Sequence, residues 1–260
     1  MRFKDFLWIS FSYTYIAFVG FSSAIMFVIA CCIRLITSFF DRRLILLNLF
    51  SSFWASIYIW VMPIWSVNIV GRQKMNISKN YVIVSNHQSQ IDILILYRLF
   101  YPFRWISKAE VFHLPFIGWN MLLNGYIKLK RGDKESVKQM MDQCEKLLKK
   151  NISIIMFPEG TRSKSGLLKP FKPGAFILAK KMKKSILPLV INNTKNALPK
   201  HSLILHKSQL EVKVLDEIAY SKFKDMEIDE IADMVQHMIS SQVKEHIALE
   251  QEKYIGKTAN

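Results

Sequence analysis

The sequence predicts an α/β domain, with a mixed central sheet flanked by helices, preceded by an apolar two-helix membrane motif. Three observations support this. Short β-type runs alternate with helical patterns after residue 71. Two runs of 28 residues, 6–33 and 44–71, contain no charge. The net charge is +16, of which +13 falls after residue 71 because the first 71 residues hold five Lys/Arg and two Asp/Glu. A chain that is 51% hydrophobic is not disordered, and three cysteines exclude a disulfide scaffold.

The two charge-free runs predict a membrane-associated helical hairpin over residues 1–65. As a helix, each run would span about 42 Å, more than a bilayer core of about 30 Å. If both crossed, Arg34, Arg42 and Arg43 would lie outside, against the positive-inside rule. Either one run crosses, or the pair forms a hairpin that dips into one leaflet, which we favour. A cleaved signal peptide fits poorly, because the apolar segment is too long.

The α/β domain is expected over residues 66–260, on the cytoplasmic face of an anionic membrane. Periodicity predicts strands at 67–70, 81–84, 104–107, 126–129, 152–157 and 186–191. It predicts helices at 91–100, 134–150, 174–182 and 228–249. A hairpin is expected from segments 203–205 and 210–215.

The first chemical motif lies between a predicted strand and a predicted helix. His87 and Asp92 are five residues apart, so they would not share one face of a regular helix. They meet if His87 lies in the loop and Asp92 in the first helical turn. The pair would then form a His–Asp dyad, with one ring nitrogen left as a base. The alternative is a helix cap in which Ser89 caps the helix and Asp92 reaches back.

The second motif follows the predicted strand 152–157. Pro158 ends the strand, and Gly160 permits a tight turn or a close approach to a ligand. Thr161, Arg162 and Ser163 offer hydrogen-bond donors that suit a phosphate. The alternative is an ordinary surface turn with a solvated basic face.

The third motif runs from Lys108 to Arg131. Arg131 is followed by Gly132 and Asp133, a turn signal. Its guanidinium is therefore expected at the carboxyl end of a strand, where ligand sites of open α/β sheets lie. The alternative for this segment alone is that its apolar residues pack in the core and its basic residues end a strand.

In this order, over about residues 65–195, the motifs resemble those of the glycerolipid acyltransferase family, most closely the bacterial 1-acylglycerol-3-phosphate acyltransferases. The family's four motifs correspond to Asn86-His87-x4-Asp92; Lys108, Gly118 and Arg131, with Val111 in place of Leu; Phe157–Ser163; and Pro188 in an apolar strand.

The resemblance implies transfer of a fatty acyl group from acyl-CoA or acyl carrier protein to the free hydroxyl of 1-acylglycerol-3-phosphate, giving phosphatidic acid. His87 would be the general base, and Asp92 would fix its tautomer. The implied substrate-binding residues are Lys108 at the oxyanion; Arg131, Gly160, Thr161 and Arg162 at the phosphate; and Glu159, which would orient Arg162 or another donor.

Three alternatives remain. The acceptor could be another lysophospholipid, since motifs overlap among relatives. A non-catalytic, membrane-anchored lipid-binding protein would predict a damaged motif, whereas all polar motif positions are intact. A nucleic-acid-binding protein would predict aromatics interleaved with basic stripes, which the sequence does not show. We expect no cofactor and no metal, because the remaining histidines lack paired spacing with Cys or carboxylates: His113, His201, His206, His237 and His246.

Overall fold

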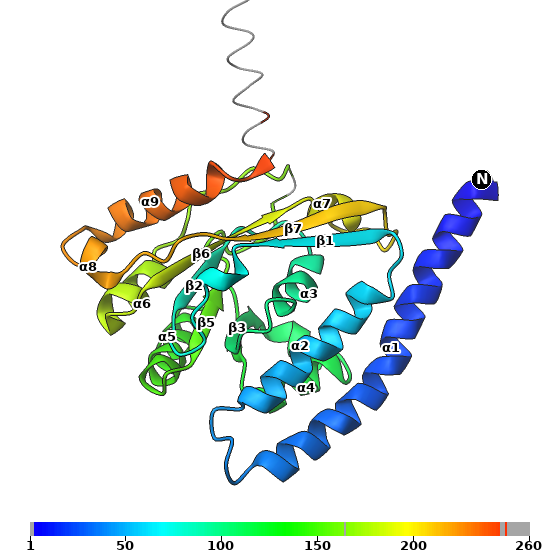
Figure 1. Cartoon of the computed structure of the whole chain (residues 1–260), viewed down its shortest axis with the longest axis horizontal. Coiled ribbons are helices and arrows are strands. Elements are labelled where there is room, and N and C mark those ends of the chain that lie inside the picture. The colour runs from blue at the N-terminus through cyan, green and yellow to red at the C-terminus, as the bar shows by residue number, and fades with distance from the viewer. Residues whose placement is uncertain (1–2, 164, 245–247, 249–260) are drawn as a thin grey trace, which may run out of the picture.

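The protein is built on a seven-stranded mixed sheet, in the order β1-β7-β6-β2-β5-β3-β4. The computed structural model describes residues 3–163, 165–244 and 248 (Figure 1). The strands are β1 (Trp65–Val70), β2 (Val82–Ser85), β3 (Phe103–Lys108), β4 (Ile127–Leu129), β5 (Ser153–Met156), β6 (Ile186–Asn192) and β7 (Ser208–Val214). The helices are α1 (Phe3–Thr37), α2 (Ile45–Trp60), α3 (Ile91–Tyr97), α4 (Ile117–Leu123), α5 (Lys134–Lys149), α6 (Gly174–Met182), α7 (Thr194–Ala197), α8 (Tyr220–Phe223) and α9 (Ile228–Ser240).

Five neighbouring strands, β6, β2, β5, β3 and β4, run parallel. Strand β7 is antiparallel to β6 and parallel to β1. The predicted mixed α/β architecture is therefore confirmed. Because the five parallel strands point the same way, the loops that leave their carboxyl ends gather at one edge of the sheet.

The sheet is covered on both faces, and alternation along the strands explains why. In β2, Val82 and Val84 join a core with α5, α6 and α9, whereas Ile83 joins a second core with α2 and α3. Figure 1 shows these two sets of helices on opposite sides of the sheet. Strands buried on both faces need continuous apolar runs, which is the pattern that the sequence carries.

Two predictions at the carboxyl-terminal side need correction. The hairpin over 203–215 does not form, because only β7 is a strand and it pairs with β1 and β6. Residues 203–205 run as a loop instead, and the Leu205 N–H donates to Ser12 Oγ of α1 at 3.1 Å. The final helix begins as expected at Ile228, with a capping box, but ends at Ser240. Of its predicted remainder, residues 245–247 and 249 lie outside the described residues, as does His246.

The first charge-free run forms one helix, and the second does not. Helix α1 is long and apolar enough to cross a membrane, and only 11% of its most apolar window is buried. Helix α2 has 16 residues, about 24 Å, which is shorter than a bilayer core of about 30 Å. The rest of the second run becomes strand β1. Both helices of the predicted apolar motif are therefore present, and the strand predicted at 67–70 takes the end of the second run.

Helix α2 is held in the α/β domain by buried polar contacts. Asn48 donates to the Phe103 carbonyl at 2.9 Å and to the Tyr126 hydroxyl at 3.0 Å. The connector between α1 and α2 is also tied down, since the buried Arg104 donates to the Arg43 carbonyl at 2.6 Å. The connector thus lies against β3, on the same side as the domain. The membrane-associated hairpin over residues 1–65 and the division of the chain after residue 65 stay predictions.

Candidate active site

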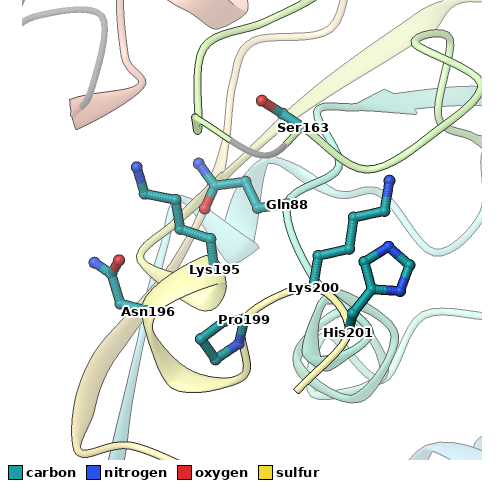
Figure 2. Close-up of a pocket in the computed structure, with 7 residues that line it drawn as sticks. All are labelled: Gln88, Ser163, Lys195, Asn196, Pro199, Lys200 and His201. Atoms are coloured by element: carbon teal, nitrogen blue, oxygen red, sulfur yellow. The ribbon is translucent and has the colours of Figure 1, made fainter.

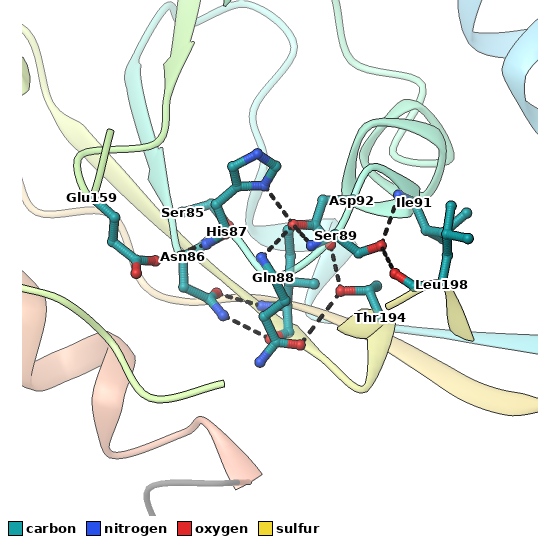
Figure 3. A network of polar contacts seen from close by, with 11 residues as sticks. Ser85, Asn86, His87, Gln88, Ser89, Ile91, Asp92, Glu159, Thr194 and Leu198 are labelled. Carbon is teal, nitrogen blue, oxygen red and sulfur yellow. Dashed lines mark hydrogen bonds and ion pairs between the residues drawn. The ribbon is translucent and has the colours of Figure 1, made fainter. Parts of the chain in front are cut away.

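The first motif places its two chemical groups in contact at the carboxyl end of β2. His87 lies in the loop after the strand, and Asp92 is the second residue of α3. Nδ1 of His87 lies 2.7 Å from Oδ2 of Asp92 (Figure 3). Asp92 is fully buried, whereas the His87 side chain is 13% exposed. The Nε2 atom of His87 has no hydrogen-bond partner among the described residues, so the geometry allows it to act as a base.

The carboxylate of Asp92 also accepts hydrogen bonds from backbone N–H groups. Oδ2 of Asp92 accepts from the N–H groups of Gln88 at 2.7 Å and Ser89 at 3.0 Å. Asp92 therefore does reach back at the start of the helix, as the capping alternative expected. The N-cap residue is Gln90 rather than Ser89, and its side chain makes no cap bond. His87 and the hydroxyl of Thr194 also contact this carboxylate, so it has four partners in all.

An aromatic stack holds the imidazole ring of His87 in place. The ring of Phe157 lies parallel to it, with centroids 4.0 Å apart and planes inclined by 11°. Trp105 in turn stacks on Phe157, with ring centroids 5.7 Å apart. With the bond to Asp92, this contact leaves the imidazole little freedom to rotate, and pre-organisation of this kind lowers the cost of reaching a reactive geometry.

Glu159 holds the two site loops together, and the donors that it contacts are backbone N–H groups. Oε1 accepts from the His87 backbone N–H at 2.9 Å, and Oε2 accepts from the Lys169 N–H at 3.2 Å. It makes no hydrogen bond or ion pair with Arg162 in the described chain. The loops are joined again where the Ser163 N–H donates to the His87 carbonyl at 2.8 Å. The side chain is only 4% exposed, and burial raises the pKa of its carboxyl group.

The other predicted side chains lie at the same edge of the sheet without touching the dyad. Lys108 ends β3 and pairs with Glu110 at 3.0 Å, both side chains being exposed. Arg131 is exposed in the turn after β4. Gly160 has a φ of +70°, a conformation that favours glycine, and Thr161 and Arg162 beside it are half-buried. Neither a hydrogen bond nor an ion pair joins any of these side chains to His87 or Asp92 in the part of the chain that the structure describes.

Gly118, in the third motif, is explained by packing. A Cβ on Gly118 would lie 2.5 Å from the Phe112 carbonyl oxygen and 2.7 Å from that of Val111. The start of α4 therefore approaches the preceding turn at a distance that only glycine permits. The role of Gly118 in this structure is to allow this close approach.

Two polar residues near the dyad make contacts that the local sequence does not predict. Asn86 joins its loop to β6, because its side chain donates to the Ile191 carbonyl and accepts from the Ile191 N–H, both at 2.8 Å. Thr194, fully buried at the start of α7, donates its hydroxyl to Oδ1 of Asp92. Thr194 lies 102 residues from Asp92 in the chain, and its only sequence signal is its position just after a strand that ends at the same edge.

We expect Thr194→Val to lower the acyl-transfer rate proposed below by about tenfold while KM values stay near wild type. The variant keeps the shape but leaves Oδ1 of Asp92 without a donor, a loss of about 1–3 kcal/mol, and 1.4 kcal/mol corresponds to tenfold. Steady-state kinetics measures the effect. Thr194→Ser restores the hydroxyl and should recover most of the rate. An unchanged rate in the valine variant would contradict the positioning role.

We expect the stability difference between wild type and Glu159→Gln to change with pH. The pKa of Glu159 is raised in the folded chain, so its stabilising contribution is present below the pKa of about 4.5 in the unfolded chain and is lost as pH rises through the folded value. The glutamine does not ionise, so wild type should lose thermal stability relative to the variant between about pH 4 and pH 7. Thermal unfolding across this range checks the sign. A difference that is flat or runs the other way would contradict a net burial penalty.

A pocket of about 600 Å³ opens beside the dyad, on the β6 side. Its lining residues are Gln88, Ser163, Lys195, Asn196, Pro199, Lys200 and His201 (Figure 2). Gln88 directly follows His87, and Lys195 directly follows Thr194. The pocket therefore adjoins the site. None of its lining residues belongs to the predicted substrate-binding set.

Comparison with known proteins agrees with this site. The family model described as Acyltransferase matches residues 66–192, which include every motif residue named above. Through this segment, the chain is similar to the acyltransferase family. Its relatives include proteins named 1-acyl-sn-glycerol-3-phosphate acyltransferase.

Two such relatives show the extent of the similarity. The chloroplastic enzyme of Arabidopsis thaliana is 41% identical over 171 residues, covering 65% of this chain and 48% of the relative. The Saccharomyces cerevisiae enzyme is 32% identical over 183 residues, covering 69% and 60%. The chain thus spans about half the length of the curated relatives it matches. The crystal structure of the 1-acyl-sn-glycerophosphate acyltransferase PlsC from Thermotoga maritima shares the fold, with a TM-score of 0.66 at 20% identity over 90% of this chain and 96% of that one.

Proposed function

We propose that this protein transfers a fatty acyl group from an acyl thioester, acyl-CoA or acyl carrier protein, to the free hydroxyl of 1-acylglycerol-3-phosphate, giving phosphatidic acid. The observation that carries the proposal is the His87–Asp92 contact at 2.7 Å, with Nε2 of the imidazole left available. The relatives named above support the choice of acceptor.

The proposed chemistry needs a base and no protein nucleophile. Nε2 of His87 takes the proton of the acceptor hydroxyl while its oxygen attacks the thioester carbonyl carbon. The tetrahedral intermediate collapses, the C–S bond breaks, and the sulfur receives the proton from the imidazolium. Asp92 keeps the Nδ1–H tautomer and stabilises the imidazolium while it exists. A thiolate leaves readily, so no strong acid is required.

The substrate-binding roles form the second part of the proposal. Arg131 and Arg162, with Thr161 and the backbone at Gly160, bind the acceptor's phosphate, because guanidinium groups and N–H donors suit that anion. Lys108 or backbone N–H groups stabilise the oxyanion. All of these residues follow β3, β4 or β5, and so approach His87 from one direction along the sheet edge. The reaction as written requires no metal and no cofactor, and activity should survive a chelator.

The membrane is the proposed source of the acceptor. Helix α1 is apolar over residues 6–37 and presents Phe21, Val28 and Leu35 to its surroundings. We propose that it attaches the domain to the cytoplasmic face of an anionic membrane, to which the excess of +13 after residue 71 is attracted. A lysolipid then reaches the site from the bilayer without crossing water.

The test is a direct assay of the purified full chain in mixed micelles. Lysophosphatidic acid is offered with acyl-CoA or acyl carrier protein, beside a panel of lysophospholipids with other head groups, and products are identified by mass spectrometry. Phosphatidic acid as the main product supports the proposal. A different preferred acceptor would replace the substrate assignment. Lipid binding without transfer from either donor would favour a non-catalytic lipid-binding protein.

A further inference from the structure

Basic side chains lie on both sides of His87 along the edge of the sheet. The strand order places β2, which leads to His87, between β6 and β5. The proposed phosphate ligands Arg131 and Arg162 follow β4 and β5, on one side. Lys195 and Lys200 follow β6, on the other. Because all four strands run parallel, both basic groups lie at the edge that carries the dyad.

The second basic group lines the pocket described above, which we call the post-β6 pocket. Its volume of about 600 Å³ falls within the range of about 300–1,000 Å³ that small-molecule sites occupy. Lys195 and Lys200 are half-buried, His201 lies exposed beside them, and the other lining residues are uncharged. Figure 2 shows both lysine side chains around the hollow that contains Gln88. Among the described residues that line it, two are lysines and none is a carboxylate, and such a lining suits an anion.

The wall of the post-β6 pocket is joined to the dyad by short connections. The Gln88 N–H donates to the same Asp92 oxygen that contacts His87. Thr194, whose hydroxyl donates to Asp92, is followed by Lys195. The Lys195 ammonium reaches across to the Ser165 carbonyl in the loop after β5. A ligand held here therefore lies next to the loop that carries His87.

We propose that the post-β6 pocket binds the phosphate of the acyl donor's phosphopantetheine arm. This inference rests on the proposed function, which requires two anionic substrates to meet at His87. The acceptor's phosphate is assigned to Arg131 and Arg162, and the remaining basic group then serves the donor. Acyl-CoA and acyl carrier protein both carry their thioester at the end of such an arm, so one phosphate site serves either donor. Lys195 and Lys200 hold the phosphate, and the thioester extends toward His87.

The first test separates donor binding from acceptor binding. Lys200→Gln should raise KM for acyl-CoA and for acyl carrier protein by about tenfold, the value of one charge-assisted hydrogen bond, with KM for the lysolipid unchanged. Lys200→Arg keeps the charge and should stay within about threefold of wild type. Lys222→Gln is the matched control, because Lys222 is exposed on α8, which Figure 1 places far from α7. A rise in the lysolipid KM, or unchanged donor KM values, would overturn the proposal.

The second test needs no turnover, so it stands even if the proposed function fails. Isothermal titration of the full chain compares 4′-phosphopantetheine with pantetheine, which lacks the phosphate. We expect wild type to bind the phosphorylated form about tenfold more tightly, and Lys200→Gln to bind both alike. Equal affinities in wild type would refute a phosphate site. A kinetic effect confined to acyl-CoA would also refute the shared-arm assignment, because it would place the nucleotide of CoA in the pocket.

Discussion

His87→Ala should lower the acyl-transfer rate by about 10²–10⁴-fold, the usual contribution of a positioned general base. No other histidine contacts Asp92 among the described residues, so nothing takes over the proton. The loss should fall on kcat, because the proposed phosphate ligands remain in place. Initial rates with lysophosphatidic acid, at saturating donor and acceptor, measure the effect.

The fold of this variant should persist, which keeps the result interpretable. The imidazole contributes one stacking contact with Phe157 and one hydrogen bond, at the edge of the core. We therefore expect a thermal unfolding midpoint close to that of wild type. His237→Ala provides the matched control, because His237 is exposed on α9. A folded His87→Ala protein with a rate within threefold of wild type would refute the dyad mechanism.

Asp92→Asn should lower kcat by about 10²-fold, because it removes the charge that stabilises the imidazolium. The hydrogen bonds around residue 92 can be kept in this variant. An amide oxygen in the Oδ2 position still accepts from Gln88 and Ser89, and the amide nitrogen then faces Thr194, whose hydroxyl turns from donor to acceptor. Thermal unfolding should show a folded protein. This substitution therefore tests the charge more directly than a truncation would.

A double variant decides whether Asp92 acts through His87. In a His87→Ala background, Asp92→Asn should cause little further loss, because groups that act as one unit are strongly non-additive. Rates of the two single variants and the double variant complete the cycle. Independent, multiplying losses would show that Asp92 contributes by another route, such as holding the loop alone.

The fold class and the dyad were predictable because their signals are local. Side chains along strands such as 81–84 alternate between the two faces of the sheet, and a separate set of helices packs on each face. His87 and Asp92 are close in sequence, and a strand–loop–helix boundary between them is enough to bring them together. The segment 157–163 was predicted at the carboxyl end of a buried strand for the same reason.

The features that the sequence did not predict share one physical cause, which is contact between distant segments. The second charge-free run divides between α2 and β1, and the Asn48 contacts hold α2 against the α/β domain. Residues 203–205 were predicted as one strand of a hairpin, but β7 pairs with β1 and β6 instead. Glu159 was expected to orient Arg162 or another donor, and the donors that it contacts are two backbone N–H groups from separate loops.

From its amino-acid sequence alone, this protein can be recognised as an apolar helix followed by an α/β domain with a His–Asp pair and a phosphate-suited loop, since periodicity and short spacing carry that information. Folding in three dimensions settled the rest. The fold places Thr194 in contact with Asp92, 102 residues away in the chain. It also fixes the backbone of His87 through a hydrogen bond to Glu159. The order of the parallel strands then places one basic group on each side of the His87 imidazole. Such arrangements depend on strand order and on buried polar groups finding partners, which no local pattern records.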